Sequence, residues 1–299
     1  MSKSREAYEA VAAQVTARLV DMIEAGPDAW QQSWRSVGAS FHQTNAATGA
    51  PYRGGNVLIT AIAAIDHGWT STEWATYKQW QQLGAQVRKG EKATRLTYWS
   101  RFVPKSERAE ARAEGREPRS IPMVNIFTVF NACQVEGYEP DHQADGLEPD
   151  ERGEQLIAAH APTITIGEPA YLPVADRITM PPLDRFTSPA DYYATLFHEM
   201  THWTGHKTRL DRLPKLIRFG DDAYGAEELV AELGAAMVAA SVGIEPAPRP
   251  DHAAYLASWL RVMKADTTAI MTAAARAGDA AHYLTAPLTA AQAAEPAQV

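Results

Sequence analysis

The stretch from His198 to His202 reads His-Glu-Met-Thr-His and restricts the fold of this chain more than any other feature. Residues four apart on a helix lie on the same face, so the two imidazoles can share one metal ion if this stretch is helical. Glu199 follows the first histidine directly and is placed to hold a water molecule on that ion. Zinc bound by two imidazoles and a carboxylate, with a fourth position open, polarises a carbonyl and activates water. The motif therefore predicts a helix with a hydrolytic metal site and Glu199 as its catalytic carboxylate.

The residues around the motif predict where this helix begins and ends. Ser188 is a residue type that caps helix N-termini, Pro189 suits the first turn, and Gly205 suits the C-terminus. Apolar residues recur at helical spacing between these limits, so one face is buried while the histidines share another. We predict a helix over residues 191–205.

A second acidic stretch supplies the candidate for a third ligand. A helix is predicted to start near Ala226, and it carries Glu228 and Glu232 four residues apart on one face, with Glu227 as a neighbour. A carboxylate turned inward among apolar residues is costly unless it binds a cation or a donor. We predict Glu228 as the third metal ligand and Glu232 as a support that orients an imidazole N–H. The alternative is a solvated acidic face on an alanine-rich helix.

A longer motif with three histidine ligands does not fit. That motif needs a third histidine six residues after His202, and this position is Thr208. His206 directly follows the predicted end of the helix and is expected in a loop.

Length and charge predict two domains. A chain of 299 residues is large for a single core. Its net charge of −8 comes from the second half, because the first half is slightly basic. Between the halves lies an acidic stretch with Gly, Pro and few apolar residues, which is typical of a linker. The predicted organisation is a first domain at 1–138, a linker at 139–154, a second domain at 155–285 and a flexible tail at 286–299.

The order of predicted elements indicates an α+β fold. In the first domain, periodicity and turn residues favour three helices and two strands, and in the second a hairpin precedes the motif helix. The expected helices are 4–25, 57–67 and 72–83, the expected strands are 93–103 and 123–131 with a charged loop at 104–120 between them, and the expected hairpin is 163–180.

Composition also predicts where the protein works. No apolar run is long enough to span a membrane, and the first residues lack the apolar stretch of a signal peptide. Cys133 is the single cysteine, so no internal disulfide can form, as is usual in a reducing compartment. We predict a cytoplasmic protein with no membrane partner.

Basic and aromatic residues are interleaved between positions 52 and 105. Single-stranded nucleic acid is bound by rings that stack on bases and by cations that follow the phosphates. The other interpretation assigns the rings to the core, and Trp74, Tyr77 and Trp80 fit it because they are spaced like a helical packing stripe. Composition leaves both interpretations open. The better candidates for DNA contacts are cations beside glycines in loops or at a strand edge: Arg53, Arg88, Lys89, Lys92 and Arg95.

Five short pieces of this sequence, in this order, resemble the ArdC-type antirestriction proteins of conjugative plasmids. The resemblance spans about residues 5–280, and Gly55 departs from it because a bulkier apolar residue is expected there. The pieces are Tyr-Arg-Gly-Gly-Asn at 52–56, Gly-Ala-Gln-Val-Arg-Lys-Gly-Glu-Lys at 84–92, Phe-Asn-Ala-Cys-Gln-Val-Glu-Gly at 130–137, His-Glu-Met-Thr-His-Trp-Thr-Gly-His at 198–206 and Glu-Glu-Leu-Val-Ala-Glu at 227–232.

The resemblance implies a single-stranded-DNA-binding domain followed by a zincin-like metallopeptidase domain, which together protect incoming plasmid DNA from restriction in the recipient. The implied metal ligands fall on His198, His202 and Glu228, and the catalytic carboxylate falls on Glu199. The implied ion is Zn²⁺, with Mn²⁺ or another divalent ion as the alternative. Single-stranded DNA is the expected partner, and a protein of the restriction system is the candidate peptidase substrate. The alternative function is a DNA-coating protein whose metal site is structural or vestigial.

Overall fold

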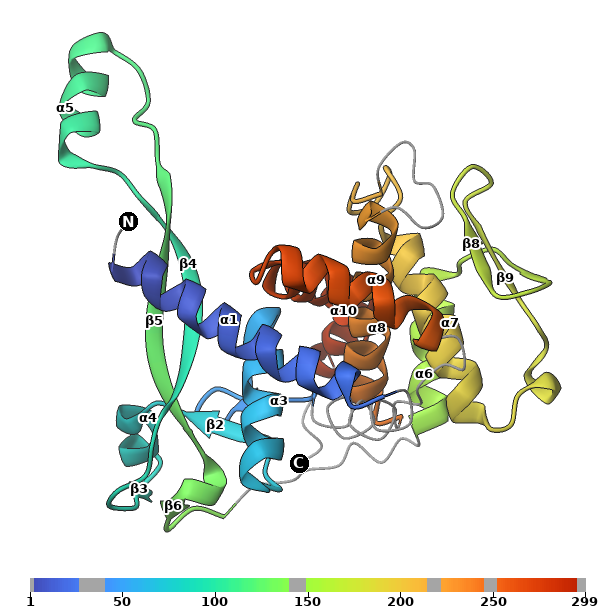
Figure 1. Ribbon diagram of the computed structural model, residues 1–299, viewed down its shortest axis with the longest axis horizontal. Coiled ribbons are helices and arrows are strands. Elements are labelled where there is room, and N and C mark those ends of the chain that lie inside the picture. The colour runs from blue at the N-terminus through green and yellow to red at the C-terminus, as the bar shows by residue number, and fades with distance from the viewer. Residues whose placement is uncertain (1–2, 27–40, 140–148, 214–221, 245–251, 295–299) are drawn as a thin grey trace.

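The computed structural model of the 299-residue chain describes residues 3–26, 41–139, 149–213, 222–244 and 252–294. Its architecture is the predicted α+β arrangement of two domains, an N-terminal domain built on a sheet and a largely helical C-terminal domain (Figure 1). No helix in these ranges is long and apolar enough to cross a membrane.

The sheet of the N-terminal domain is dominated by a long ribbon of two antiparallel strands, β4 (Thr94–Phe102) and β5 (Ile121–Asn131). Strand β5 also pairs with β2 (Glu73–Ala75), and β2 pairs with β1 (Thr44–Asn45). Figure 1 shows the ribbon extending away from the body of the protein with a helix at its far end. The two strands confirm the predicted ones within two residues at each end.

The helix at the end of the ribbon, α5 (Lys105–Glu114), corrects the predicted loop at 104–120. Alanine, glutamate and arginine are strong helix formers, and Gly115 ends the helix with a positive φ of 67°. The charges suggested a solvated loop, but a solvated helix satisfies them equally well.

The predicted helix at 72–83 is also wrong in its first half, which is strand β2. The helix α4 covers only Tyr77–Gln82 and begins at a capping box between Thr76 and Gln79. Trp74 and Trp80 are both fully buried, as expected of core residues, but Tyr77 is 45% exposed, so the three do not form one packing stripe. Two short strands, β3 (Gln86–Val87) and β6 (Val135–Glu136), complete this part of the domain as an antiparallel pair.

The C-terminal domain begins with α6 (Pro149–His160) and a three-stranded sheet. Strand β9 (Arg177–Met180) lies between β7 (Ile164–Ile166), which is parallel to it, and β8 (Ala170–Leu172), which is antiparallel. The predicted hairpin is therefore β8–β9, with β7 added along its other edge.

Among the described residues, four helices follow this sheet and form the body of the domain. The motif helix α7 (Pro189–Thr204) packs against α8 (Asp222–Val242), and α10 (Ala269–Ala294) packs against both. The fourth helix, α9 (His252–Ala265), lies against α8. The helix α7 begins after Ser188 and ends before Gly205, the two residues predicted as its caps.

Two predicted boundaries differ from the helices found. The last residues of the predicted linker at 139–154 belong to α6. The first residues of the predicted tail at 286–299 belong to α10, which continues past Pro287 because alanine favours helix. The remaining parts, 140–148 and 295–299, lie outside the described residues.

The two domains share one hydrophobic core. Helix α1 (Lys3–Glu24) packs on β5 and also on α9 and α10, while α3 (Gly55–His67) joins β4 to α10 (Figure 1). Leu19 of α1 is 2% exposed within this core. Thr16 Oγ1 donates to the carbonyl of Thr267 at 2.7 Å, which fixes α1 to the connection before α10.

Candidate metal centre

Local signals in the sequence place α7. Ser188 accepts a hydrogen bond from the Asp191 backbone N–H at 3.2 Å, as a helix N-cap does. Gly205 ends the helix, and a Cβ there would lie 2.8 Å from Leu213 Cγ, so a larger residue would force its neighbours to shift. His198 and Glu199 are 2% and 4% exposed in the middle of this helix. The helix thus presents its histidines to α8 and not to solvent.

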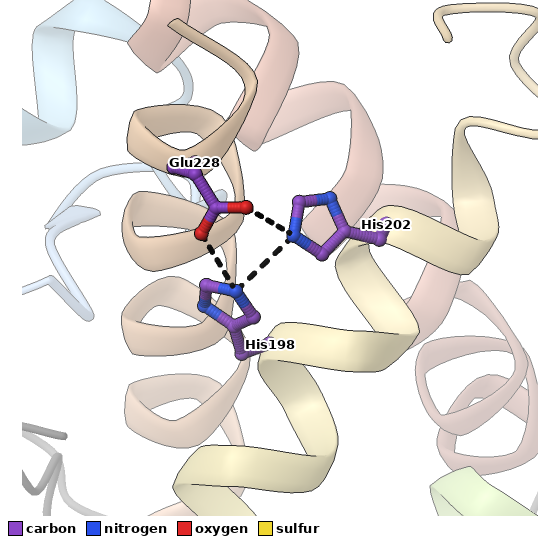
Figure 2. Close-up of side chains that lie close together, drawn as sticks. All are labelled: His198, His202 and Glu228. Carbon is purple, nitrogen blue, oxygen red and sulfur yellow. Dashed lines mark hydrogen bonds and ion pairs between the residues drawn. The ribbon is translucent and has the colours of Figure 1, made fainter. Parts of the chain in front are cut away.

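Close packing of α8 on α7 brings the acidic residues to the histidines. A Cβ on Gly234 would lie 2.5 Å from Thr201 Cγ2, so the glycine lets the two helices approach closely. Figure 2 shows Glu228 of α8 facing His198 and His202 of α7. Glu228 is 4% exposed, which excludes the solvated acidic face considered from the sequence.

The donor atoms of these three residues are spaced as metal ligands. His198 Nε2 and His202 Nε2 are 3.1 Å apart, and the Glu228 carboxylate oxygens lie 3.4 Å from His198 Nε2 and 3.5 Å from His202 Nε2 (Figure 2). Ligands about 2.0–2.1 Å from a tetrahedral ion are about 3.3–3.4 Å from one another. Two imidazoles and one carboxylate are also a donor set that divalent ions such as zinc bind. The residues present therefore fit a divalent metal ion, in agreement with the type of fold.

Each histidine is held on its far side by a second carboxylate. Glu232 Oε1 lies 2.9 Å from His198 Nδ1, the place predicted for it as an orienting group. Glu227 Oε1 lies 3.3 Å from His202 Nδ1. The His202 contact is a hydrogen bond, whereas the His198 contact is an ion-pair contact between the two side chains. A carboxylate beside Nδ1 orients a ring so that Nε2 points to the centre. The geometry thus provides one orienting carboxylate per imidazole.

Glu227 is in turn held by Arg212, a residue that sequence analysis did not single out. The two side chains are both 6% exposed and form an ion pair with Arg212 Nη2 and Nε at 2.9 and 3.1 Å from the Glu227 carboxylate. Arg212 Nη2 also donates to the Thr201 carbonyl at 2.7 Å. An arginine close in sequence to a metal motif could have been considered as a supporting residue. Its partner Glu227 lies 15 positions away in the sequence, so the ion pair becomes visible only in the folded structure.

The carboxylates make the centre favour positive charge. Burial lowers the pKa of His202, but its hydrogen bonds to Glu227 and Glu228 outweigh burial and raise the pKa to about 10. Burial raises the pKa of Glu228, yet the hydrogen bonds from His198 and His202 hold it well below its ordinary value. A positive charge among these carboxylates is therefore strongly stabilised.

The residues predicted to contact DNA lie in two separate parts of the N-terminal domain. Lys89 and Lys92 are exposed in the turn between β3 and β4, and Arg95 is exposed near the start of β4. Arg53 lies before α3 and lines a different hollow. Arg88 is committed elsewhere, because it pairs with Glu91 at 3.0 Å and donates to backbone carbonyls of the β6 region.

The ribbon also exposes apolar side chains that sequence analysis did not place at the surface. Tyr98 and Trp99 are 52% and 53% exposed, although large aromatic residues are usually buried. Basic residues such as Arg95 and Arg101 accompany them on β4. Phe102, Ile121 and Met123 are also exposed there.

Gly55, the departure from the family pattern, lies against Met271 of α10. A Cβ on Gly55 would lie 2.3 Å from Met271 Cε and 3.0 Å from its Sδ. The methionine side chain therefore fills the space that a bulkier residue at position 55 would take, and it does so from the other domain.

Comparisons with known proteins match both domains. Residues 9–130 match the N-terminal domain of anti-restriction factor ArdC, and residues 151–276 match the zincin-like metallopeptidase family MPTase-PolyVal. The protein y4eC of Sinorhizobium fredii is 38% identical over 93% of this chain and 92% of its own length. The DNA primase TraC of Escherichia coli is 36% identical over 95% of this chain, which spans only 28% of the primase.

Crystal structures of the antirestriction protein ArdC from plasmid R388 match nearly the whole length. The metal-free structure is 36% identical with a TM-score of 0.73 and covers 93% of this chain and 98% of that one. The Mn(II)-bound structure is 37% identical with a TM-score of 0.72 and covers 92% and 97%. This chain therefore belongs to the ArdC family of plasmid antirestriction proteins.

Proposed function

We propose that this protein binds single-stranded DNA through its N-terminal domain, that its C-terminal domain is a metal-dependent peptidase, and that both act in protecting incoming plasmid DNA from restriction. The observation that carries the peptidase half is the spacing of the His198, His202 and Glu228 donor atoms, which suits a single divalent ion. Zn²⁺ is the proposed ion, and Mn²⁺ is the alternative because the R388 ArdC protein was crystallised with Mn(II).

Each residue of the centre has a distinct proposed role. His198, His202 and Glu228 hold the ion, and Glu232 and Glu227 fix the two rings. The ion supplies Lewis acidity for a peptide carbonyl. Glu199 accepts the proton of the attacking water and passes it to the leaving amine. A protein of the restriction system is the proposed substrate.

The three-stranded sheet offers a place for an extended peptide. Within the described residues, β7 and β8 are the two edge strands of this sheet, and α7 packs against β8 and β9. A peptide bound along an edge strand gains main-chain hydrogen bonds without any demand on its sequence. This supports a peptidase that selects substrates by accessibility of an extended segment.

The affinity for a divalent ion is expected to rise with pH. His202 keeps its proton well above pH 7 because its pKa is about 10, and an entering ion must displace that proton. At pH 7–8 each bound Mn²⁺ should release about one proton, so the association constant rises by up to about tenfold per pH unit. Calorimetric titration in two buffers of different ionisation enthalpy counts the protons. An affinity for Mn²⁺ that stays constant from pH 6 to 8 contradicts the assignment of His202 as a ligand that loses a proton on binding.

DNA binding by the N-terminal domain is supported by the exposed lysines and rings described above. Lys89 and Lys92 present cations without partners among the described residues, while Tyr98 and Trp99 present half-exposed rings. Rings and cations together bind single strands in preference to duplex, whose bases are already stacked. The acidic C-terminal domain does not attract the phosphates.

Replacing Lys89 and Lys92 by alanine is expected to lower the affinity for single-stranded DNA. The affinity of the variant should also depend less on the salt concentration. Each phosphate contact removed lowers the slope of log K against log salt by roughly 0.7. Fluorescence anisotropy of an oligothymidylate over a range of salt measures both quantities. Arg88 is left intact because its side chain holds the turn. Lys207→Ala, an exposed lysine of the C-terminal domain, is the control, and an equal effect there removes the turn from the DNA site.

A further inference from the structure

A cavity lies where the two domains meet. It has a volume of about 260 Å³ and is lined by residues of α1, α3, β4 and α10 together with the segment before α3. Pockets for drug-sized ligands usually exceed about 300 Å³, so this volume suits a small planar group such as a base. The cavity is separate from the metal centre, since none of the residues that line it belongs to α7 or α8.

The walls of the cavity combine rings with two opposite charges. Tyr8 and Trp99 form an edge-to-face pair with centroids 5.6 Å apart, and Tyr98 also lines the wall. Arg53 contributes a guanidinium and Asp279 a carboxylate. Both side chains are exposed, and neither forms an ion pair or a side-chain hydrogen bond with any described residue. Both charges are thus available to a ligand.

The shape of the cavity is fixed by backbone contacts between the domains. A Cβ on Gly278 of α10 would lie 2.7 Å from the Gly54 backbone N, so only glycine permits this approach. Gly54 has a positive φ of 58°. Asn56 donates to the Thr97 carbonyl at 2.7 Å and accepts from the Thr97 N–H at 2.9 Å, which ties α3 to β4. The cavity is therefore preformed and belongs to both domains.

We propose that this cavity binds one unstacked cytosine of single-stranded DNA, with the base against the rings that line the cavity, its amino group donating to Asp279, and the adjoining phosphate on Arg53. The inference rests on the proposed function, which it extends by naming a base. Arginine binds phosphate through paired N–H donors. A carboxylate accepts from cytosine N4, whereas thymine presents a carbonyl oxygen there, which a carboxylate repels. The carboxylate also repels phosphate, so the two charges set the orientation of the nucleotide.

Binding at this cavity connects DNA to the peptidase domain. Asp279 and Gly278 belong to α10, which packs against α7 and α8 of the metal centre. A cytosine held here touches both domains at once, whereas DNA along the β3–β4 turn touches only the first. DNA bound in this cavity therefore contacts the domain that carries the metal ligands directly.

Anisotropy titrations with fluorescent oligodeoxycytidylate and oligothymidylate of equal length test the proposal on the full-length protein. The wild type should bind the cytosine oligomer about tenfold more tightly, as expected for one charge-assisted hydrogen bond. Asp279→Asn should remove this preference, because an amide both donates and accepts. Arg53→Gln should weaken both oligomers alike. Asp21→Asn on α1 and Arg276→Gln on α10 are exposed matched controls that should change neither value.

The outcomes separate this proposal from the proposed function. Equal binding of both oligomers by the wild type, or a cytosine preference that survives Asp279→Asn, overturns the cavity as a base site while DNA binding stands. Unchanged binding by Arg53→Gln removes the phosphate contact and overturns the assigned orientation. Binding of neither oligomer by the wild type ends both proposals together.

Discussion

Replacing Glu199 by alanine is expected to lower peptide hydrolysis by about 10²–10⁴-fold while the protein still binds one divalent ion, because a general acid–base contributes a factor of this size. Glu199 is buried beside His198 but is not one of the three residues whose donor atoms are clustered. Loss of its carboxylate therefore removes proton transfer and leaves the ligands in place. The measurements are kcat/KM on an unstructured peptide and metal content of the same preparation.

Two control variants test whether the effect is specific to Glu199 and separate from loss of the metal ion. Glu6→Ala, an exposed glutamate of α1, should hydrolyse peptides at the wild-type rate. His202→Ala should lose both hydrolysis and metal, since it removes a proposed ligand. A Glu199→Ala protein that cleaves normally excludes the role of proton carrier. One that has lost its ion contradicts the assignment of metal binding to His198, His202 and Glu228 alone.

The same variant decides between the two functions considered for the family. Protection of transferred plasmid DNA in a restricting recipient should fall with Glu199→Ala if proteolysis is required. Full protection by this variant, together with normal affinity for single strands, instead supports a protein that acts by coating DNA. If both domains act in protection, Glu199→Ala is expected to lose it.

Replacing Leu19 by alanine is expected to lower the free energy of unfolding by about 2–5 kcal/mol. Leu19 is 2% exposed in the core that α1 shares with β5, α9 and α10, so the cavity left behind cannot collapse easily. Because the core is continuous, both domains should lose stability in one transition. Denaturant unfolding gives the size of the loss, and hydrogen exchange followed at α3 and at α8 shows whether it reaches both.

Gln14→Ala is the matched control for this experiment, because position 14 lies on the exposed side of the same helix. Its stability should stay within about 0.5 kcal/mol of the wild type. Faster exchange in α3 with unchanged exchange in α8 would show two independently stable units and contradict the shared core.

Local signals in the sequence were sufficient for α7 but not for α5 or β2. Ser188 and Gly205 cap α7 through contacts within a few residues, so sequence alone predicted its limits. The charged segment of α5 has no apolar face, and the helix was missed because only propensity supports it. Trp74 pairs in register with Asn131, a partner 57 positions away, and this pairing overrides the helical spacing.

The candidate centre shows the same limit. His198 and His202 are neighbours on one helix, so their spacing predicted that they face the same point. The prediction of Glu228 as third ligand rests on the cost of burying a carboxylate that binds neither a cation nor a donor. The role of Arg212 could not be predicted from the sequence. Its ion pair with Glu227 forms only because α8 packs closely on α7, and the contact at Gly234 permits this close packing.

Sharing of one core by the two domains has an evolutionary consequence. Recombination between them would strip α1 of the surface it covers and leave apolar area open to water, so each fragment would be prone to aggregation. Inheritance of the pair as a block is therefore favoured. The primase TraC is consistent with this, because its matching region takes in 95% of this chain and thus carries both halves together.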